Sequence, residues 1–136
     1  MLIMSFKISK DDFQSAGEAS SKIKKKLLQL GFPGSLIRRI TIATYEAEMN
    51  LVIHSDGGTI SAEIYPGSVC IVVSDVGPGI PDLNKAMQEG YSTASEQVRE
   101  MGFGAGMGLP NMRNCASEFT IDSVIGKGTT IKMLIS

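Results

Sequence analysis

The stretch Gly102-Phe103-Gly104-Ala105-Gly106-Met107-Gly108-Leu109 has glycine at every second position and is followed by Pro110. Glycine loses more backbone entropy on folding than other residues and adds no side chain to a core, so such a run is a poor strand and a poor helix. It does let backbone N–H groups approach an anion closely, and Pro110 suits the start of a helix, whose N-terminus attracts negative charge. The stretch predicts a phosphate-binding loop, with a flexible linker as the alternative.

Two better-known phosphate-binding motifs do not fit these glycines. A P-loop requires Gly-Lys followed by Ser or Thr, and the sequence has no such tripeptide here. The dinucleotide-binding fingerprint follows directly on a buried strand, whereas residues 95–100 are mainly polar. The assignment of the loop therefore depends on the rest of the chain.

Length and composition indicate one globular domain over residues 1–136. With 43% hydrophobic and 20% charged residues and a net charge of −1, the chain has no electrostatic footprint for nucleic acid. No apolar run approaches the roughly 18 residues of a membrane span, and the N-terminus lacks the basic leader of a signal peptide. Cys70 and Cys115 lack metal-ligand spacing and are expected to be buried thiols. We therefore expect a cytoplasmic protein that binds neither nucleic acid nor membrane.

The first part of the chain predicts one strand and two helices. Residues 2–8 alternate between two faces, as a strand does. Asp11 or Asp12 is expected to cap a helix with apolar residues at three- and four-residue spacing. A second helix, over residues 36–54 and capped by Ser35, is apolar nearly all round and should be largely buried.

Glu46 and Asn50 lie four residues apart on one face of this second helix, and His54 follows one turn later. Burial of a carboxylate without a partner is unfavourable. Glu46 is therefore expected either at a solvated edge or facing a cavity in which its charge is used. His54 is expected to form a hydrogen bond at the helix end and not to bind a metal.

The second part of the chain predicts four strands around an acidic, glycine-rich loop. Residues 59–65 and 69–74 should form a hairpin closed by Pro66-Gly67, and residues 69–74 are apolar on both faces, as in a central strand. Asp75-Val76-Gly77-Pro78-Gly79 follows directly, so Asp75 is placed to line a ligand crevice, with a plain turn as the alternative. The further elements expected are a short helix over 82–88, a mobile segment over 89–101, a helix over 110–116, and strands over 118–125 and 129–135.

This order of elements predicts an α/β (α+β) two-layer sandwich. Hairpin-joined strands with few helices indicate a mixed, mostly antiparallel sheet covered by helices on one face. Glu46, Asn50, Asp75 and the glycines can then share one cleft between the helices and the sheet.

Four stretches, in this order, resemble the motifs of the GHKL ATP-binding superfamily of gyrase, MutL, heat-shock chaperone and histidine-kinase ATPase domains. Residues 46–54 resemble its N box, and residues 75–80, 104–109 and 126–130 resemble its three glycine boxes. The resemblance implies a Bergerat fold with an ATP lid between the first two glycine boxes. Within the superfamily the chain is most similar to the small bacterial anti-sigma factors and switch-protein serine kinases.

The resemblance implies ATP and Mg²⁺ as cofactors and gives a role to each motif. Asp75 would accept a hydrogen bond from the adenine amino group, and Gly77 and Gly79 would let the backbone pass close to the base. Asn50 would offer a neutral oxygen to Mg²⁺. Glu46 would be the general base that activates a hydroxyl or water near the γ-phosphate.

The remaining site residues would hold the phosphates and support the base. Backbone N–H groups would bind the phosphates, and Thr129 would support the adenine pocket through Asp75 or a water. Two features depart from the family pattern. Gly104 stands where several relatives have a basic residue, for which Arg99 is a candidate substitute, and the extra Gly102 and Phe103 would loosen closure of the lid. The phosphate-binding residues are Gly104, Gly106, Met107, Gly108 and Leu109.

The function that the resemblance implies is an ATP-dependent protein serine/threonine kinase that also acts as an anti-sigma-type switch. Its implied partners are an antagonist protein with a phosphorylatable Ser or Thr, and a sigma factor or another regulatory protein; a homodimer stays open. Two alternatives stay open as well: a histidine-kinase ATPase catalytic domain, and an ATP-sensing binding module without catalysis. Against the histidine kinase, we expect no dimerisation helices before residue 1, and Glu46 favours a hydroxyl or water acceptor.

Overall fold

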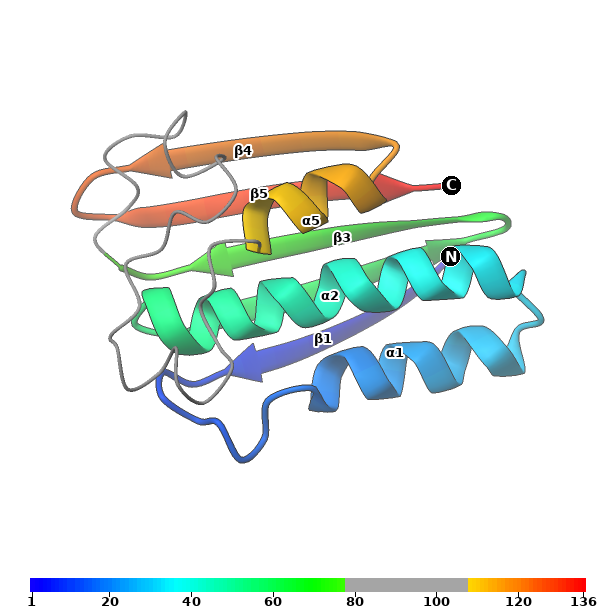
Figure 1. Ribbon diagram of the computed structural model, residues 1–136, viewed down its shortest axis with the longest axis horizontal. Coiled ribbons are helices and arrows are strands. Elements are labelled where there is room, and N and C mark those ends of the chain that lie inside the picture. The colour runs from blue at the N-terminus through cyan, green and yellow to red at the C-terminus, as the bar shows by residue number, and fades with distance from the viewer. Residues whose placement is uncertain (78–107) are drawn as a thin grey trace.

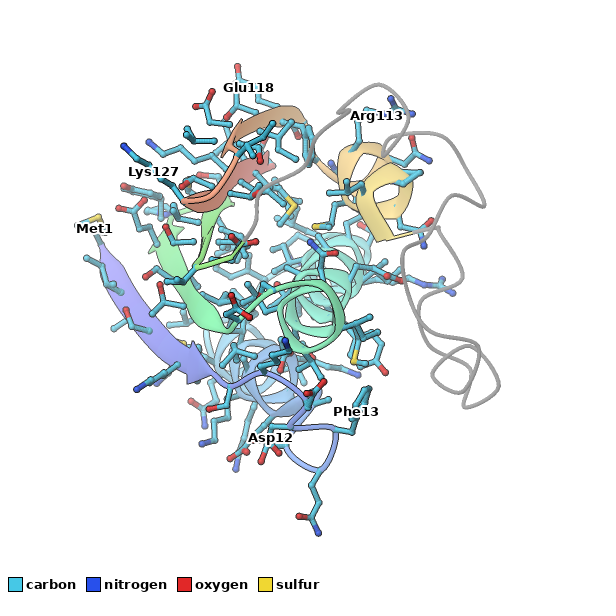
Figure 2. All side chains as sticks on the ribbon, turned by 90° about the vertical axis from the view of Figure 1, so that its left-hand side faces the viewer. Met1, Asp12, Phe13, Arg113, Glu118 and Lys127 are labelled. Atoms are coloured by element: carbon cyan, nitrogen blue, oxygen red, sulfur yellow. The ribbon has the colours of Figure 1, made fainter. Side chains whose placement is uncertain are left out.

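Strands with alternating or continuous apolar residues form a five-stranded sheet in the computed structural model, which describes residues 1–77 and 108–136. The strand order is β1-β2-β3-β5-β4, and every neighbouring pair in it is antiparallel. The helices of the described residues lie on one face of the sheet (Figure 1 and Figure 2), which confirms the predicted fold class. The elements are β1 (Leu2–Ile8), α1 (Glu18–Gln29), α2 (Gly34–His54), β2 (Gly58–Tyr65), β3 (Ser68–Asp75), α5 (Gly108–Cys115), β4 (Glu118–Val124) and β5 (Gly128–Ile135).

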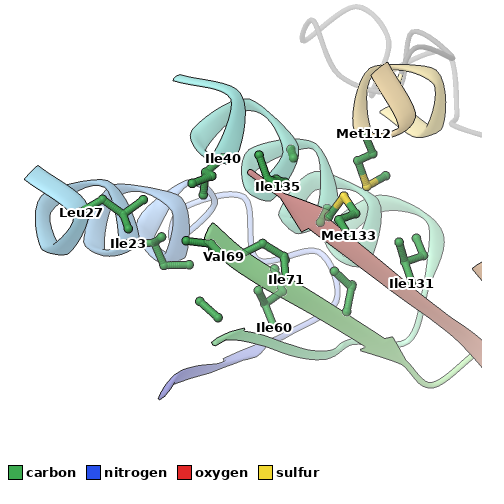
Figure 3. Packing of buried hydrophobic residues seen from close by; sticks show 14 of the residues in the cluster. Ile23, Leu27, Ile40, Ile60, Val69, Ile71, Met112, Ile131, Met133 and Ile135 are labelled. Atoms are coloured by element: carbon green, nitrogen blue, oxygen red, sulfur yellow. The ribbon is translucent and has the colours of Figure 1, made fainter. Parts of the chain in front are cut away.

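The hydrophobic core lies between the sheet and the helices. The central strand β3 directs Val69, Ile71 and Val73 towards the helices, and none of them is more than 2% exposed. Figure 3 shows Met112 of α5 and Met133 of β5 pointing into the same cluster. Burial of each large apolar side chain contributes about 1.5–3 kcal/mol, so α5 and the central strands are held to one common core.

Helix α2 crosses the middle of the sheet and is largely buried, as predicted. Its exposed stripe includes Ile42 and Tyr45, which are 40% and 39% exposed. The helix begins at Gly34 with Pro33 as its N-cap residue, so the predicted cap by Ser35 is wrong. In the part of the chain that the structure describes, no helix has both the length and the apolar character of a membrane-spanning segment.

The start of α1 also differs from the prediction. The helix begins at Glu18 and not directly after Asp11 or Asp12. The Asp12 side chain is used earlier, because its Oδ1 accepts a hydrogen bond from the N–H of Ser15 at 3.2 Å in a turn before the helix. Gly17 is the N-cap residue, with a left-handed φ of 93° that glycine adopts without a steric penalty.

The two cysteines, Cys70 and Cys115, are free thiols that are only half-buried, so the prediction of buried thiols is wrong. Desolvation is the main cause that raises the pKa of both thiols. A raised pKa keeps a thiol protonated and unreactive at neutral pH.

The antiparallel topology brings several element ends to one end of the molecule. Strand β3 ends, α2 ends and β5 begins at the left of Figure 1, which is the side that faces the viewer in Figure 2. The turn between β4 and β5, which Lys127 marks in Figure 2, lies there as well. The predicted elements over 82–88 and 89–101, and the candidate site residues Gly79, Gly104, Gly106 and Met107, lie outside the described residues.

Candidate functional site

Asp75 is the last residue of β3, and the neighbouring strand β5 sets the direction of its carboxylate. The backbone N–H of Thr129 donates a hydrogen bond to Asp75 Oδ1 at 2.6 Å. The predicted contact between these two residues is thus present, and it uses the backbone, while the Thr129 hydroxyl lies 2.9 Å from the Ser123 hydroxyl. A Cβ atom at Gly128 would collide with the Asp75 carbonyl oxygen and lie 2.9 Å from Oδ1. Only glycine therefore allows β5 to approach Asp75 this closely.

Partial burial raises the pKa of Asp75. Desolvation is the largest cause, the hydrogen bond from the Thr129 N–H lowers the pKa, and the nearby Asp56 carboxylate raises it. A carboxylate with incomplete solvation gains from any further donor that a bound molecule brings. This environment suits the predicted role of Asp75 as a hydrogen-bond acceptor for a ligand.

The loop after β3 is tied to the segment between α2 and β2. The N–H of Asp56 donates to the Val76 carbonyl at 2.7 Å, and the N–H of Val76 donates to the Gly57 carbonyl at 3.0 Å. The N–H of Gly77 reaches the Lys127 carbonyl at 3.4 Å. Gly77 is thereby held beside Asp75, at the end of the central strand.

Glu46 lies on a half-buried face of α2 and reaches the start of α5. Its Oε1 accepts a hydrogen bond from Asn111 Nδ2 at 3.2 Å. Its Oε2 lies next to Gly108, because a Cβ atom at that glycine would be 3.5 Å away. The sequence interpretation missed Asn111, although its position three residues after Gly108 places both on one face of a helix.

Asn50 lies one turn after Glu46 and is also half-buried, whereas Ala47 between them is fully buried. Among the described residues, no group of three or more His, Cys, Asp or Glu side chains is arranged to hold a metal ion. A single amide oxygen such as that of Asn50 fits Mg²⁺ only if other oxygens, such as those of phosphates or water, complete its shell.

The structure therefore gathers the described candidates into two groups. Glu46 and Gly108 meet where α2 contacts α5, with Asn50 one turn further along α2, while Asp75 and the residues around it lie at the end of β3. Leu109, which is 8% exposed, packs into the core, and His54 is the last residue of α2. Gly77 and Thr129 complete the second group.

Glu48 is a buried carboxylate whose partner the sequence did not reveal. It is 1% exposed, and its oxygens accept three backbone N–H groups at the start of α1. These donors are Gly17 at 3.0 Å, Ala19 at 3.1 Å and Ser20 at 2.7 Å. A carboxylate at a helix N-terminus satisfies free N–H groups and opposes the helix dipole. Glu48 therefore serves the fold, and of these two glutamates of α2 it is Glu46 that reaches the start of α5.

Comparison with known proteins identifies a family and several relatives. The family model described as histidine kinase-, DNA gyrase B-, and HSP90-like ATPase matches residues 36–136. The serine/threonine-protein kinase RsbT of Bacillus subtilis is 34% identical over 110 residues, which cover 78% of this chain and 77% of that protein. An anti-sigma F factor of Caldanaerobacter subterraneus is 37% identical over 102 residues, which cover 71% of this chain and 68% of that protein.

Two solved structures share the fold over nearly the whole chain. A Mycobacterium tuberculosis protein with RsbU and RsbW domains superimposes with a TM-score of 0.65 at 19% identity, over 99% of this chain and 32% of that one. The catalytic domain of the histidine kinase ThkA superimposes with a TM-score of 0.54 at 18% identity, over 99% of this chain and 95% of that one. At these identities the likeness concerns the fold.

Proposed function

Because the chain belongs to the histidine kinase-, DNA gyrase B-, and HSP90-like ATPase family, as its sequence motifs predicted, we propose that it is an ATP-dependent protein serine/threonine kinase that regulates a partner protein. The names of two relatives, a serine/threonine kinase and an anti-sigma factor, support both halves of this proposal. The coverage of those relatives, 77% and 68% of their length, includes most of each protein.

The single observation that carries the catalytic part is the position of Glu46. Its carboxylate lies against Gly108, the first residue of α5, and it shares a helix face with Asn50. A general base must lie within reach of the proton that it removes. The N-terminus of a helix after a glycine-rich stretch is a favourable place for phosphates to bind, so the position of Glu46 supports its assignment as the base.

The described residues fit ATP with Mg²⁺, which when bound supplies the phosphoryl group to be transferred. Asp75 would accept a hydrogen bond from the adenine amino group, because an ionised carboxylate is acceptor-only. Asn50 would provide an oxygen to the metal. Backbone N–H groups at the start of α5 would bind phosphate oxygens. Glu46 would take the proton from a Ser or Thr hydroxyl of the partner as that oxygen bonds to the γ-phosphorus and the bond from this phosphorus to the leaving ADP breaks.

The partner in this proposal is an antagonist protein that carries the phosphorylated Ser or Thr, with a sigma factor or another regulatory protein as the target that it releases. Dependence on ATP favours the cytoplasm as the location. A homodimer is compatible with this scheme and is not required by it.

Phosphoryl transfer from radiolabelled ATP to a candidate antagonist protein, sought first among the products of neighbouring genes, tests the proposal. Glu46→Gln keeps the size of the side chain but cannot take a proton, so it should retain Mg·ATP while transfer falls by about 10²–10⁴. Glu118→Gln, at an exposed glutamate of β4, is the matched control and should leave transfer unchanged. Asn50→Ala should weaken Mg·ATP binding as well as transfer.

The stability of the label separates this proposal from its alternatives. Acid-stable label on the partner is expected for phosphoserine or phosphothreonine. Acid-labile label would instead indicate a histidine kinase, and ATP binding without transfer would indicate a non-catalytic module. Undiminished transfer by Glu46→Gln would refute the assignment of the base.

A further inference from the structure

Asn111 contacts the proposed base from a different helix. Its Nδ2 atom donates to Glu46 Oε1 at 3.2 Å, across the contact between α5 and α2. The chemistry of the pair fixes the orientation of the amide, because an ionised carboxylate can only accept and the Asn111 N–H₂ group must therefore face it. Oε2 is left beside Gly108, at the N-terminus of α5. The two carboxylate oxygens of Glu46 thus have different surroundings.

Asn111 is itself held firmly in place by the helix that carries it. Leu109 is 8% exposed and Met112 is fully buried, so the residues on both sides of Asn111 are anchored in the core. At the other end of α5, Arg39 Nε of α2 donates to the Cys115 carbonyl at 3.0 Å. An exposed glutamate samples many rotamers, and restricting it has an entropic cost. A donor on a fixed helix restricts the side chain before substrate arrives.

We propose that Asn111 is a positioning residue that holds Glu46 Oε1, so that Oε2 is the oxygen that removes the proton from the partner's hydroxyl. This inference rests on the proposed function and adds a residue outside the four sequence motifs that implied it. Asn111 acts only through Glu46. Its loss should therefore lower the rate of the chemical step while ATP binding stays intact.

Substitutions that nearly preserve the size of the side chain test this role in the transfer assay. Asn111→Leu removes the donor, and we expect kcat to fall about 3- to 10-fold, the loss typical of one hydrogen bond. Asn111→Asp replaces the donor with a like charge, and we expect a larger fall in kcat. In both variants the KM for ATP should stay within about twofold of the wild type. Asn114→Leu and Asn114→Asp, at an exposed asparagine of the same helix, are the matched controls and should change neither quantity.

A double-mutant cycle with Glu46→Gln distinguishes positioning from a general effect on the fold. If Asn111 acts through Glu46, Asn111→Leu should cause no further loss of rate in the Glu46→Gln background. Additive losses would overturn the inference, as would an unchanged kcat in both Asn111 variants. A rise in KM with kcat unchanged would also overturn it, because that result indicates a role in binding.

The contact between Asn111 and Glu46 can also be detected by a measurement that does not depend on kinase activity. In an NMR spectrum of the side-chain amides, the Asn111 resonances should move in Glu46→Gln and stay in place in Glu118→Gln. Unchanged Asn111 resonances in Glu46→Gln would overturn this inference and would leave the proposed function unaffected. Absence of transfer in the wild type, with the Asn111 resonances moving as expected, would instead overturn the proposed function and the kinetic role that rests on it, while the contact itself stands.

Discussion

Recognition of the nucleotide base is proposed to depend on the charge of Asp75. In Asp75→Asn, Oδ1 can still accept the Thr129 N–H, but the other oxygen becomes an N–H₂ group that faces the donor of the adenine. We expect Mg·ATP affinity to fall by about 1–3 kcal/mol, or roughly one to two decades. Calorimetric titration measures this change. Asp122→Asn, at an exposed aspartate of β4, should bind as the wild type does; an equal affinity in Asp75→Asn would contradict the assignment.

The same substitution should have the opposite effect on the stability of the nucleotide-free protein. The pKa of Asp75 is raised above its ordinary value of 3.8, mainly by desolvation, so the folded chain binds this proton more tightly than the unfolded chain does. The free energy of unfolding therefore decreases as the pH rises from about the unfolded pKa through the folded one. Asparagine carries no charge and avoids this loss.

Thermal unfolding of Asp75→Asn and wild type across this pH range checks the sign. The Tm advantage of the variant should be small near pH 3.8, the ordinary value for aspartate, and should reach its full size above the raised pKa. If the Tm advantage of Asp75→Asn shrinks as the pH increases, the folded state stabilises the charged Asp75 carboxylate. That result would contradict the raised pKa.

At the level of elements, the start of α1 depends on a side chain of α2. The Glu48 side chain is 1% exposed and accepts hydrogen bonds from three backbone N–H groups at that helix start. Glu48→Gln places an N–H₂ group against these donors, and we expect it to destabilise the protein by about 2–4 kcal/mol. Urea denaturation measures the loss. Hydrogen exchange should show faster exchange of the Ala19 and Ser20 amides, and Glu118→Gln should be neutral in both measurements.

The close approach of β5 to the end of β3 is a second element-level feature with a direct test. Gly128 has a φ of 144° and leaves no space for a Cβ atom beside Asp75. Gly128→Ala should therefore destabilise the protein by at least about 1 kcal/mol and displace Asp75, lowering ATP affinity about 10-fold or more. Gly34→Ala is the matched control, since a Cβ atom there has no neighbour within 4 Å. An ATP affinity that survives Gly128→Ala would mean that Asp75 keeps its place without this glycine.

At the scale of the whole molecule, the parts predicted correctly from the sequence are those that local patterns determine. The strand over residues 2–8 and the hairpin closed by Pro66-Gly67 follow from alternation and turn chemistry, which act over a few residues. The contact between Asp75 and Thr129 was predicted only because their motifs resembled those of a known family.

The errors and omissions involve contacts between distant parts of the chain. The pattern around Asp12 permits a helix start. Helix α1 instead begins further along the chain, where its first N–H groups bind Glu48, 28–31 residues away in the sequence. The contact between Glu46 and Asn111 spans 65 residues. Its geometry follows from how α5 packs on α2, and no local pattern specifies this packing.

Binding of Mg·ATP should stabilise the whole fold, because the proposed site joins α2, β3, β5 and α5. A ligand that binds only the folded state, present at 100 times its Kd, adds about 2.7 kcal/mol to the free energy of unfolding, which for a chain of this length raises the Tm by about 5–15 °C.

Removal of the metal with EDTA should reduce this shift in Tm, since Asn50 and the phosphates are proposed to share the ion. In Asn50→Ala the difference between ATP with Mg²⁺ and ATP with EDTA should therefore shrink, and in Asn114→Ala it should not. If ATP does not change the Tm of the wild type, nucleotide binding at this site is contradicted. If ATP raises the Tm fully in the presence of EDTA, the role of Asn50 in binding the metal is contradicted.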